Sequence, residues 1–171
     1  TTTALRNAGG ASGAAASIKL PDTFIVSATQ KLSDQWELLG DVSWTGWSSI
    51  PKVDIIRTSG ALNGQNAQIL DTDFRDTWRF AAGANYKLNN EWLLKGGIAY
   101  DQTPVKGAST RLVSLPDNDR TWFSIGAQWK QSQNVTLDVG ATYLYVSDTK
   151  IDNDQAAAGR GRITGTYEDS A

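Results

Sequence analysis

The sequence predicts an all-β protein, an antiparallel transmembrane β-barrel of outer-membrane type, to which these 171 residues contribute about 7–8 strands. Apolar and polar side chains alternate with period two along repeated stretches of about ten residues. Aromatic side chains recur eight residues apart on the apolar side of these stretches. Short turns alternate with long loops as the connections between these stretches, and this is the connection pattern of bacterial outer-membrane barrels.

The segment from Thr77 to Asp101 shows the alternation most clearly. One face of this predicted hairpin is uncharged and interrupted only by the turn Asn89–Asn90, and it consists of Trp78, Phe80, Ala82, Ala84, Tyr86, Leu88, Trp92, Leu94, Gly96, Ile98 and Tyr100. Asn tolerates the positive φ of a tight turn. Eight tilted residues rise about 19 Å, which approaches the ~25 Å apolar band and its two aromatic girdles. We therefore expect a membrane-spanning pair of strands.

Two further hairpins repeat this design. The first runs from Phe24 to Leu32 and from Trp36 to Thr45, and the second from Thr121 to Lys130 and from Val135 to Tyr145. We also expect a strand to begin at Ser17–Leu20 and a further strand at Arg162–Tyr167. The remaining segments are predicted to be loops: 1–16 (an extracellular loop or a frayed edge), 48–74, 102–120 and 147–162.

The predicted faces separate the charged residues completely. No charged residue falls on the outward face, where Gln30 is the only strongly polar side chain, and the charged strand and turn residues fall inward: Lys31, Glu37, Asp41, Arg79, Lys87, Glu91, Lys95, Asp101, Lys130 and Asp138. A Lys or Arg on the lipid face would cost about 2–4 kcal/mol at the midplane. The outward set is therefore expected to contact outer-membrane lipid, and the inward set a lumen.

Composition excludes several functions. The formal net charge of −2 shows no excess of positive charge, which nucleic-acid binding needs. Without His or Cys there is no thiolate or imidazole metal site and no Ser-His-Asp triad, so we expect no catalytic residue, metal or cofactor. No run of 18 apolar residues predicts a transmembrane helix. The absence of Met suggests a piece of a longer secreted protein.

Four segments resemble the FadL family of outer-membrane transporters for long-chain fatty acids and other hydrophobic compounds. They are IKLPDTFIVSATQKLSDQWELLGDVSWTGWSSI (18–50), FRDTWRFAAGANYKLNNEWLLKGGIAYDQTPV (74–105), SLPDNDRTWFSIGAQWK (114–130) and VTLDVGATYLYV (135–146). The most specific features are two. The motif LPD precedes two of the predicted strands, and the motif DR-W at Asp119–Trp122 begins the second of them.

The resemblance implies that residues 1–171 are the C-terminal part of a single 14-stranded β-barrel domain, without its N-terminal hatch and its last strand. It implies a channel in the bacterial outer membrane that takes up a hydrophobic small molecule, a fatty acid or an aromatic hydrocarbon, by passive diffusion. The complete protein is expected to be a monomer.

Four residues are candidates for ligand binding. Arg79 points inward near the extracellular end of its strand, with Arg75 just before it, and Arg pairs well with a carboxylate in a low-dielectric pocket. The alternative is a lumen ion pair of Arg79 with Asp101 or Asp41. Trp122 and Trp47 lie off the predicted girdles and are the aromatic candidates, whereas Trp36, Trp44, Trp78, Trp92 and Trp129 are expected to anchor lipid.

Two alternative functions remain open from the residues alone. The first is an outer-membrane β-barrel enzyme, which would need a nucleophile and a base and finds no His in this span. The second is a soluble lipid-binding β-barrel. Ile50, Val53, Ile55 and Ile56 either line a capture groove or pack a loop.

Overall fold

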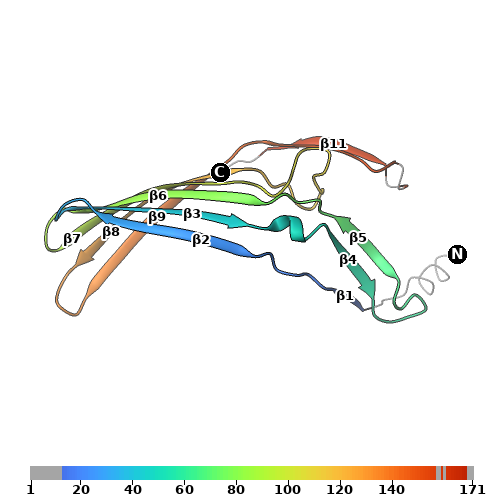
Figure 1. Ribbon diagram of the computed structural model, residues 1–171, viewed down its shortest axis with the longest axis horizontal. Helices are drawn as coiled ribbons and strands as arrows, with labels where there is room; N and C mark the ends of the chain where they lie inside the picture. The colour runs from blue at the N-terminus through green and yellow to red at the C-terminus, as the bar shows by residue number, and fades with distance from the viewer. Residues whose placement is uncertain (1–12, 157–158, 160, 169–171) are drawn as a thin grey trace.

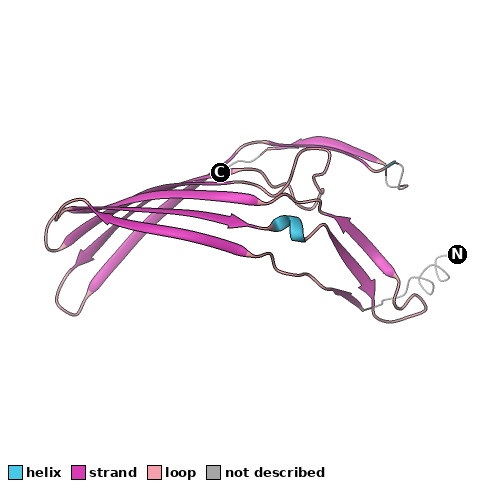
Figure 2. Ribbon diagram, in the orientation of Figure 1, coloured by secondary structure: helices cyan, strands magenta, loops and turns pink. Residues whose placement is uncertain are grey.

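The computed structural model describes residues 13–156, 159 and 161–168, which are mostly strands (Figures 1 and 2). Within these residues, helical structure is confined to a single turn at 156 and to the 3₁₀ helix η1 (Trp47–Ser49), and no helix is long and apolar enough to cross a membrane. Of the predicted loop 1–16, residues 1–12 lie outside the described residues. Ala14–Ala16 form the short strand β1 instead of a loop.

A six-stranded antiparallel sheet forms the body of the molecule, with strand order β2-β3-β6-β7-β8-β9. Its strands are β2 (Thr23–Lys31), β3 (Trp36–Thr45), β6 (Thr77–Lys87), β7 (Trp92–Asp101), β8 (Arg120–Lys130) and β9 (Thr136–Val146). These bounds confirm the three predicted hairpins to within about a residue at each end. The sheet has two free edges, β2 and β9, so the described residues form one wall of a barrel.

The three short turns of this sheet are built alike. In the first, the backbone N–H groups of Leu32 and Ser33 both donate to the carbonyl of Trp36, and the Ser33 hydroxyl accepts from the N–H of Trp36 (3.0 Å). In the second, the carboxamide oxygen of Asn89 accepts from the N–H groups of Glu91 and Trp92 (both 2.8 Å). Such side-chain-to-backbone bonds fix the turn and with it the register of both strands.

The long connections lie at the opposite end of the sheet (Figure 1). The segment between β3 and β6 contains a hairpin of β4 (Lys52–Arg57) and β5 (Asn66–Asp71), and β4 also pairs with β1. Beyond β9, the chain forms a second hairpin from β10 (Thr149–Asp154) and β11 (Arg162–Tyr167). The strand predicted at 162–167 is therefore confirmed, and it pairs with β10 outside the six-stranded sheet.

The predicted loop 48–74 contains the β4–β5 hairpin, and two further local predictions were wrong. Residues 17–20 form no strand, because the segment has no pairing partner and leads into Pro21, and Leu20 is 82% exposed. The predicted loop 147–162 contains β10, whose Thr149 and Ile151 are buried and whose backbone forms hydrogen bonds with the loop that follows β7. Its single large apolar residue gave no recognisable alternation.

The register places every predicted outward residue of the six strands on one face. Phe24 lies opposite Trp44, which lies opposite Trp78, and these rings form an aromatic row at the long-loop end. At the turn end, Trp36 lies opposite Tyr86, and Trp92 stacks on Trp129 with ring centroids 5.7 Å apart. These two rows occupy the positions of the expected girdles.

The apolar face between the two rows has no protein cover among the described residues. Val139 and Ile125 are 75% and 73% exposed there. In a water-soluble fold such a face would be packed against another layer. A transmembrane barrel presents it to the bilayer instead.

The opposite face carries the charged residues. Arg79 lies opposite Asp101, and Glu37 opposite Asn85, whose amide donates to the carboxylate (2.7 Å). Lys95 reaches across the side-chain-free Gly126 to Asp138 (2.8 Å). Water or neighbouring polar groups satisfy these residues on the lumen side of a barrel.

The buried apolar residues gather mainly among the long loops. Ile50, Val105, Leu112 and Ile151 are all less than a tenth exposed, and the fifth buried apolar residue, Ala99, lies on the inner face of β7. The packed core therefore sits over the long-loop end of the sheet. It holds the loops in fixed positions relative to the inner wall, where the candidate site is found.

Candidate ligand cavity

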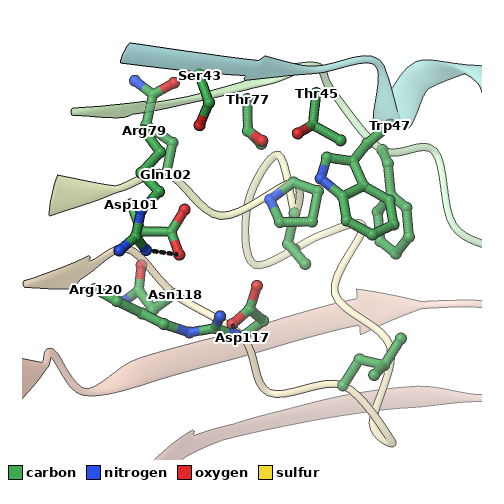
Figure 3. Close-up of a pocket in the computed structure, with 14 residues that line it drawn as sticks. Ser43, Thr45, Trp47, Thr77, Arg79, Asp101, Gln102, Asp117, Asn118 and Arg120 are labelled. Carbon is green, nitrogen blue, oxygen red and sulfur yellow. Dashed lines mark hydrogen bonds and ion pairs between the residues drawn. The ribbon is translucent and has the colours of Figure 1, made fainter. Parts of the chain in front are cut away.

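A cavity of about 550 Å³ lies where the inner face of the sheet meets the long loops (Figure 3). The sheet contributes the ends of β3, β6, β7 and β8, and the other lining residues come from the long loops at that end. The lining residues are Ser43, Thr45, Trp47, Phe74, Thr77, Arg79, Asp101, Gln102, Pro104, Val105, Leu115, Asp117, Asn118 and Arg120. A cavity of this size is typical of small-molecule sites.

The apolar part of this cavity comes from loops. Trp47 of η1 and Phe74 meet edge to face, with ring centroids 6.2 Å apart. Val105, 4% exposed, and Leu115 contribute aliphatic surface from the loop that follows β7. These side chains give one side of the cavity a surface that suits a hydrocarbon chain or an aromatic ring.

The charged part lies on the other side of the cavity (Figure 3). Arg79 Nη1 donates to Asp101 Oδ2 (3.4 Å), and the two residues are direct cross-strand partners on β6 and β7. Arg120, at the start of β8, pairs with Asp117. Both arginine side chains are about two-fifths exposed and line the cavity, and a guanidinium has five N–H donors, more than one carboxylate partner can use.

Hydrogen bonds fix the loop that follows β7 over the cavity. The Thr103 hydroxyl donates to Asp117 (2.7 Å), and the Thr103 N–H donates to Asp119 (2.8 Å). Arg111 ties the same loop to the β10–β11 hairpin, because its guanidinium donates to the carbonyls of Lys150 and Asp117. Burial is the main cause that lowers the pKa of Arg111, and nearby Asp117 opposes it.

The structure places the four predicted ligand residues in three environments. Arg79 and Trp47 line the cavity, at its charged and apolar sides. Arg75 lies at the rim, where its Nε donates to the Thr103 carbonyl (3.0 Å) and Nη2 lies 3.7 Å from Asp119. Trp122 lies on the inner wall, its ring centroid 5.8 Å from the Arg79 guanidinium carbon. The alternative ion pair of Arg79 with Asp101 is present, and a ligand role for any of the four stays a prediction.

Sequence reasoning missed several lining residues. Arg120 continues the inward alternation of β8 by one residue beyond the predicted start at Thr121, so the alternation itself was a usable signal. Phe74, Val105 and Leu115 come from irregular segments, where no periodicity marks an apolar residue as inward. Within the described residues, no cluster of three or more His, Cys, Asp or Glu side chains has a geometry that would hold a metal ion.

Comparison with known families identifies the family of barrels to which this sheet belongs. The family model described as outer membrane protein transport protein (OMPP1/FadL/TodX) matches residues 2–171. The chain belongs to this family. The predicted FadL resemblance, the transmembrane β-barrel fold and the bacterial outer-membrane location are thereby confirmed.

Relatives of this FadL-family chain are similar over most of its length. It is 32% identical over 141 residues to a long-chain fatty acid transport protein of Escherichia coli, covering 82% of this chain and 30% of that protein. It is 32% identical over 127 residues to outer membrane protein P1 of Haemophilus influenzae, covering 74% of this chain and 26% of that protein. The chain thus spans less than a third of the length of these relatives.

Two solved structures are similar to the wall. The crystal structure of a Pseudomonas aeruginosa FadL homologue superposes with a TM-score of 0.77 at 29% identity, covering 90% of this chain and 34% of that one. The CymD monoaromatic hydrocarbon channel superposes with a TM-score of 0.55 at 20% identity, covering 77% of this chain and 32% of that one. The second similarity concerns the fold alone.

Proposed function

We propose that the complete protein takes up hydrophobic molecules across the outer membrane by passive diffusion, and that the loop-covered cavity is a binding site on their path. The protein acts without a catalytic step or a cofactor, as a monomer whose outward face contacts lipid. The division of the cavity into an apolar side and a side with two arginines carries this proposal. A ligand with a hydrocarbon body and an anionic end matches both sides.

A long-chain fatty acid fits these requirements best. Its chain packs against Trp47 and Phe74, while its carboxylate accepts hydrogen bonds from Arg79 and Arg120. Bidentate Arg–carboxylate pairs are strong in a partly desolvated site. Arg75 and Trp122 assist from the rim and from the wall below. The names of the Escherichia coli relatives, long-chain fatty acid transport protein, support this ligand class.

Binding of laurate to the purified complete protein in detergent tests the proposal. We expect Arg79→Ala to weaken laurate binding about tenfold, the loss of one charge-assisted contact. Arg162→Ala is the matched control, because Arg162 pairs with Asp152 in the β10–β11 hairpin and does not line the cavity. Dodecanol should lose much less affinity than laurate with Arg79→Ala. Unchanged laurate binding in this variant would exclude Arg79 as a head-group contact.

A further inference from the structure

A carboxylate lies between two arginines at the charged side of the loop-covered cavity. Asp101 of β7 is the direct cross-strand partner of Arg79 on β6 and also of Arg120 on β8. Direct cross-strand neighbours on one face have Cβ atoms about 4.5–5.5 Å apart, so both guanidinium groups are within reach of the Asp101 carboxylate. All of these side chains line the cavity. The carboxylate can therefore pair with either arginine.

The two arginines are held unequally (Figure 3). Arg120 pairs with one carboxylate oxygen of Asp117, and the other oxygen accepts a hydrogen bond from the Thr103 hydroxyl (2.7 Å). Arg79 pairs with Asp101 through one contact of 3.4 Å, and within the described part of the chain this carboxylate has no other hydrogen bond or ion pair. A single long contact between partly exposed groups has small net strength. Arg79 is therefore the arginine that exchanges its partner more easily.

The charges that line the cavity cancel. They are the two arginines, Arg79 and Arg120, and the two aspartates, Asp101 and Asp117. An anionic head group therefore meets no net positive charge, and it must compete with Asp101 for the donors of Arg79. The head group of a fatty acid and the side chain of Asp101 are both carboxylates, so they accept the same N–H groups with similar strength.

Arg120 offers the displaced Asp101 carboxylate a second position. A guanidinium has five N–H donors, and Asp117 occupies only part of those of Arg120. Asp101 can turn from Arg79 to Arg120 because both lie directly beside it on neighbouring strands. The exchange leaves no carboxylate unpaired in a partly buried site, where an unpaired charge is costly.

We propose that Asp101 is a built-in competitor of the ligand head group. It holds Arg79 until an anionic head group arrives, then moves to Arg120, and returns when the head group leaves. This inference rests on the proposed function of the cavity. A site on a diffusion path must bind its ligand strongly enough for entry and weakly enough for release. Asp101 limits the affinity for anions and leaves the apolar side of the cavity unchanged.

Asp101→Asn in the complete protein tests this inference, because Asn keeps the size of the side chain and removes its charge. By calorimetry in detergent, we expect laurate to bind about tenfold more tightly and dodecanol to bind within about twofold of the wild type, because only laurate competes with a carboxylate. Asp138→Asn is the matched control. Asp138 is also an ion-paired carboxylate on the inner face, bonded to Lys95, but it does not line the cavity, so its loss should leave laurate affinity unchanged.

A structure of the wild type with bound laurate tests the exchange without a variant. We expect the Asp101 carboxylate within about 3 Å of the Arg120 guanidinium and the laurate carboxylate on Arg79. The inference is overturned if Asp101 stays on Arg79 while laurate fills the cavity. It is also overturned if Asp101→Asn leaves laurate affinity unchanged, or if it strengthens laurate and dodecanol equally. If the wild type binds no laurate at all, the proposed function itself fails.

Discussion

Replacing Ile125 by Arg tests which face of the sheet contacts the bilayer. Ile125 is 73% exposed on the apolar face, opposite Gly96 and Ala141, and it lies four residues from Trp129 of the turn-end aromatic row. Within the six described strands, no Asp or Glu points to this face beside Ile125 to pair with an introduced charge. An Arg near the midplane of the bilayer costs about 2–4 kcal/mol, which lowers the folding equilibrium constant about 30- to 900-fold.

The assay is reversible denaturant unfolding of the complete protein in phospholipid vesicles. Ser124→Arg is the matched control, because Ser124 is the adjacent residue on the inner face. It should lose only its contact with Thr142 (3.0 Å), worth about 1 kcal/mol. Ile125→Gln separates the cost of charge from the cost of polarity. If Ser124→Arg destabilises the barrel as much as Ile125→Arg, our assignment of the two faces is refuted.

Three further predictions concern the cavity and the loops. Trp47→Ala should weaken the binding of both laurate and dodecanol by about tenfold, because the ring contributes apolar surface and not charge; equal binding by calorimetry would remove Trp47 from the site. Arg111→Leu should leave the thermal stability of the barrel unchanged but raise protease cleavage within 102–119 and 147–168, because the guanidinium links these segments; unchanged cleavage would mean that other contacts suffice. The hydrogen bonds from Arg162 are the main cause that lowers the pKa of Asp152 from 3.8, so this pair stabilises the hairpin above pH 3.8 and the stabilisation is lost as pH falls from there through the lowered pKa. Amide protection factors of 149–154 should fall below pH 3.8 in the wild type and not in Asp152→Asn, and identical pH profiles of protection would disprove this.

The sheet was predictable because each of its strands carries two independent signals. Alternation gave the faces, and the aromatic pairs such as Trp36 and Trp44 fixed where each strand begins and ends. The turn residues then fixed the register, since Ser33 and Asn89 bond back to their own turns. A register error of one residue would have placed charges such as Lys95 in the bilayer.

The cavity was only half predictable. Arg79 is a strand residue, so its alternation placed it on the inner face and near Asp101 and Asp41. Phe74 and Leu115 belong to segments whose backbone follows no period, and their direction depends on long-range contacts such as Arg111 with Lys150. Arg79 pairs with Asp101 and not with Asp41. This choice depends on side-chain packing, which a sequence pattern does not encode.

A crystal structure of the complete protein with 12-bromododecanoate would test the ligand site most directly. The bromine marks the chain end through its anomalous signal, and the carboxylate is visible from its contacts. We predict the bromine beside Trp47 and Phe74 and the carboxylate oxygens within about 3 Å of the Arg79 or Arg120 guanidinium. A fully occupied ligand elsewhere in the lumen, with this cavity empty, would contradict the account.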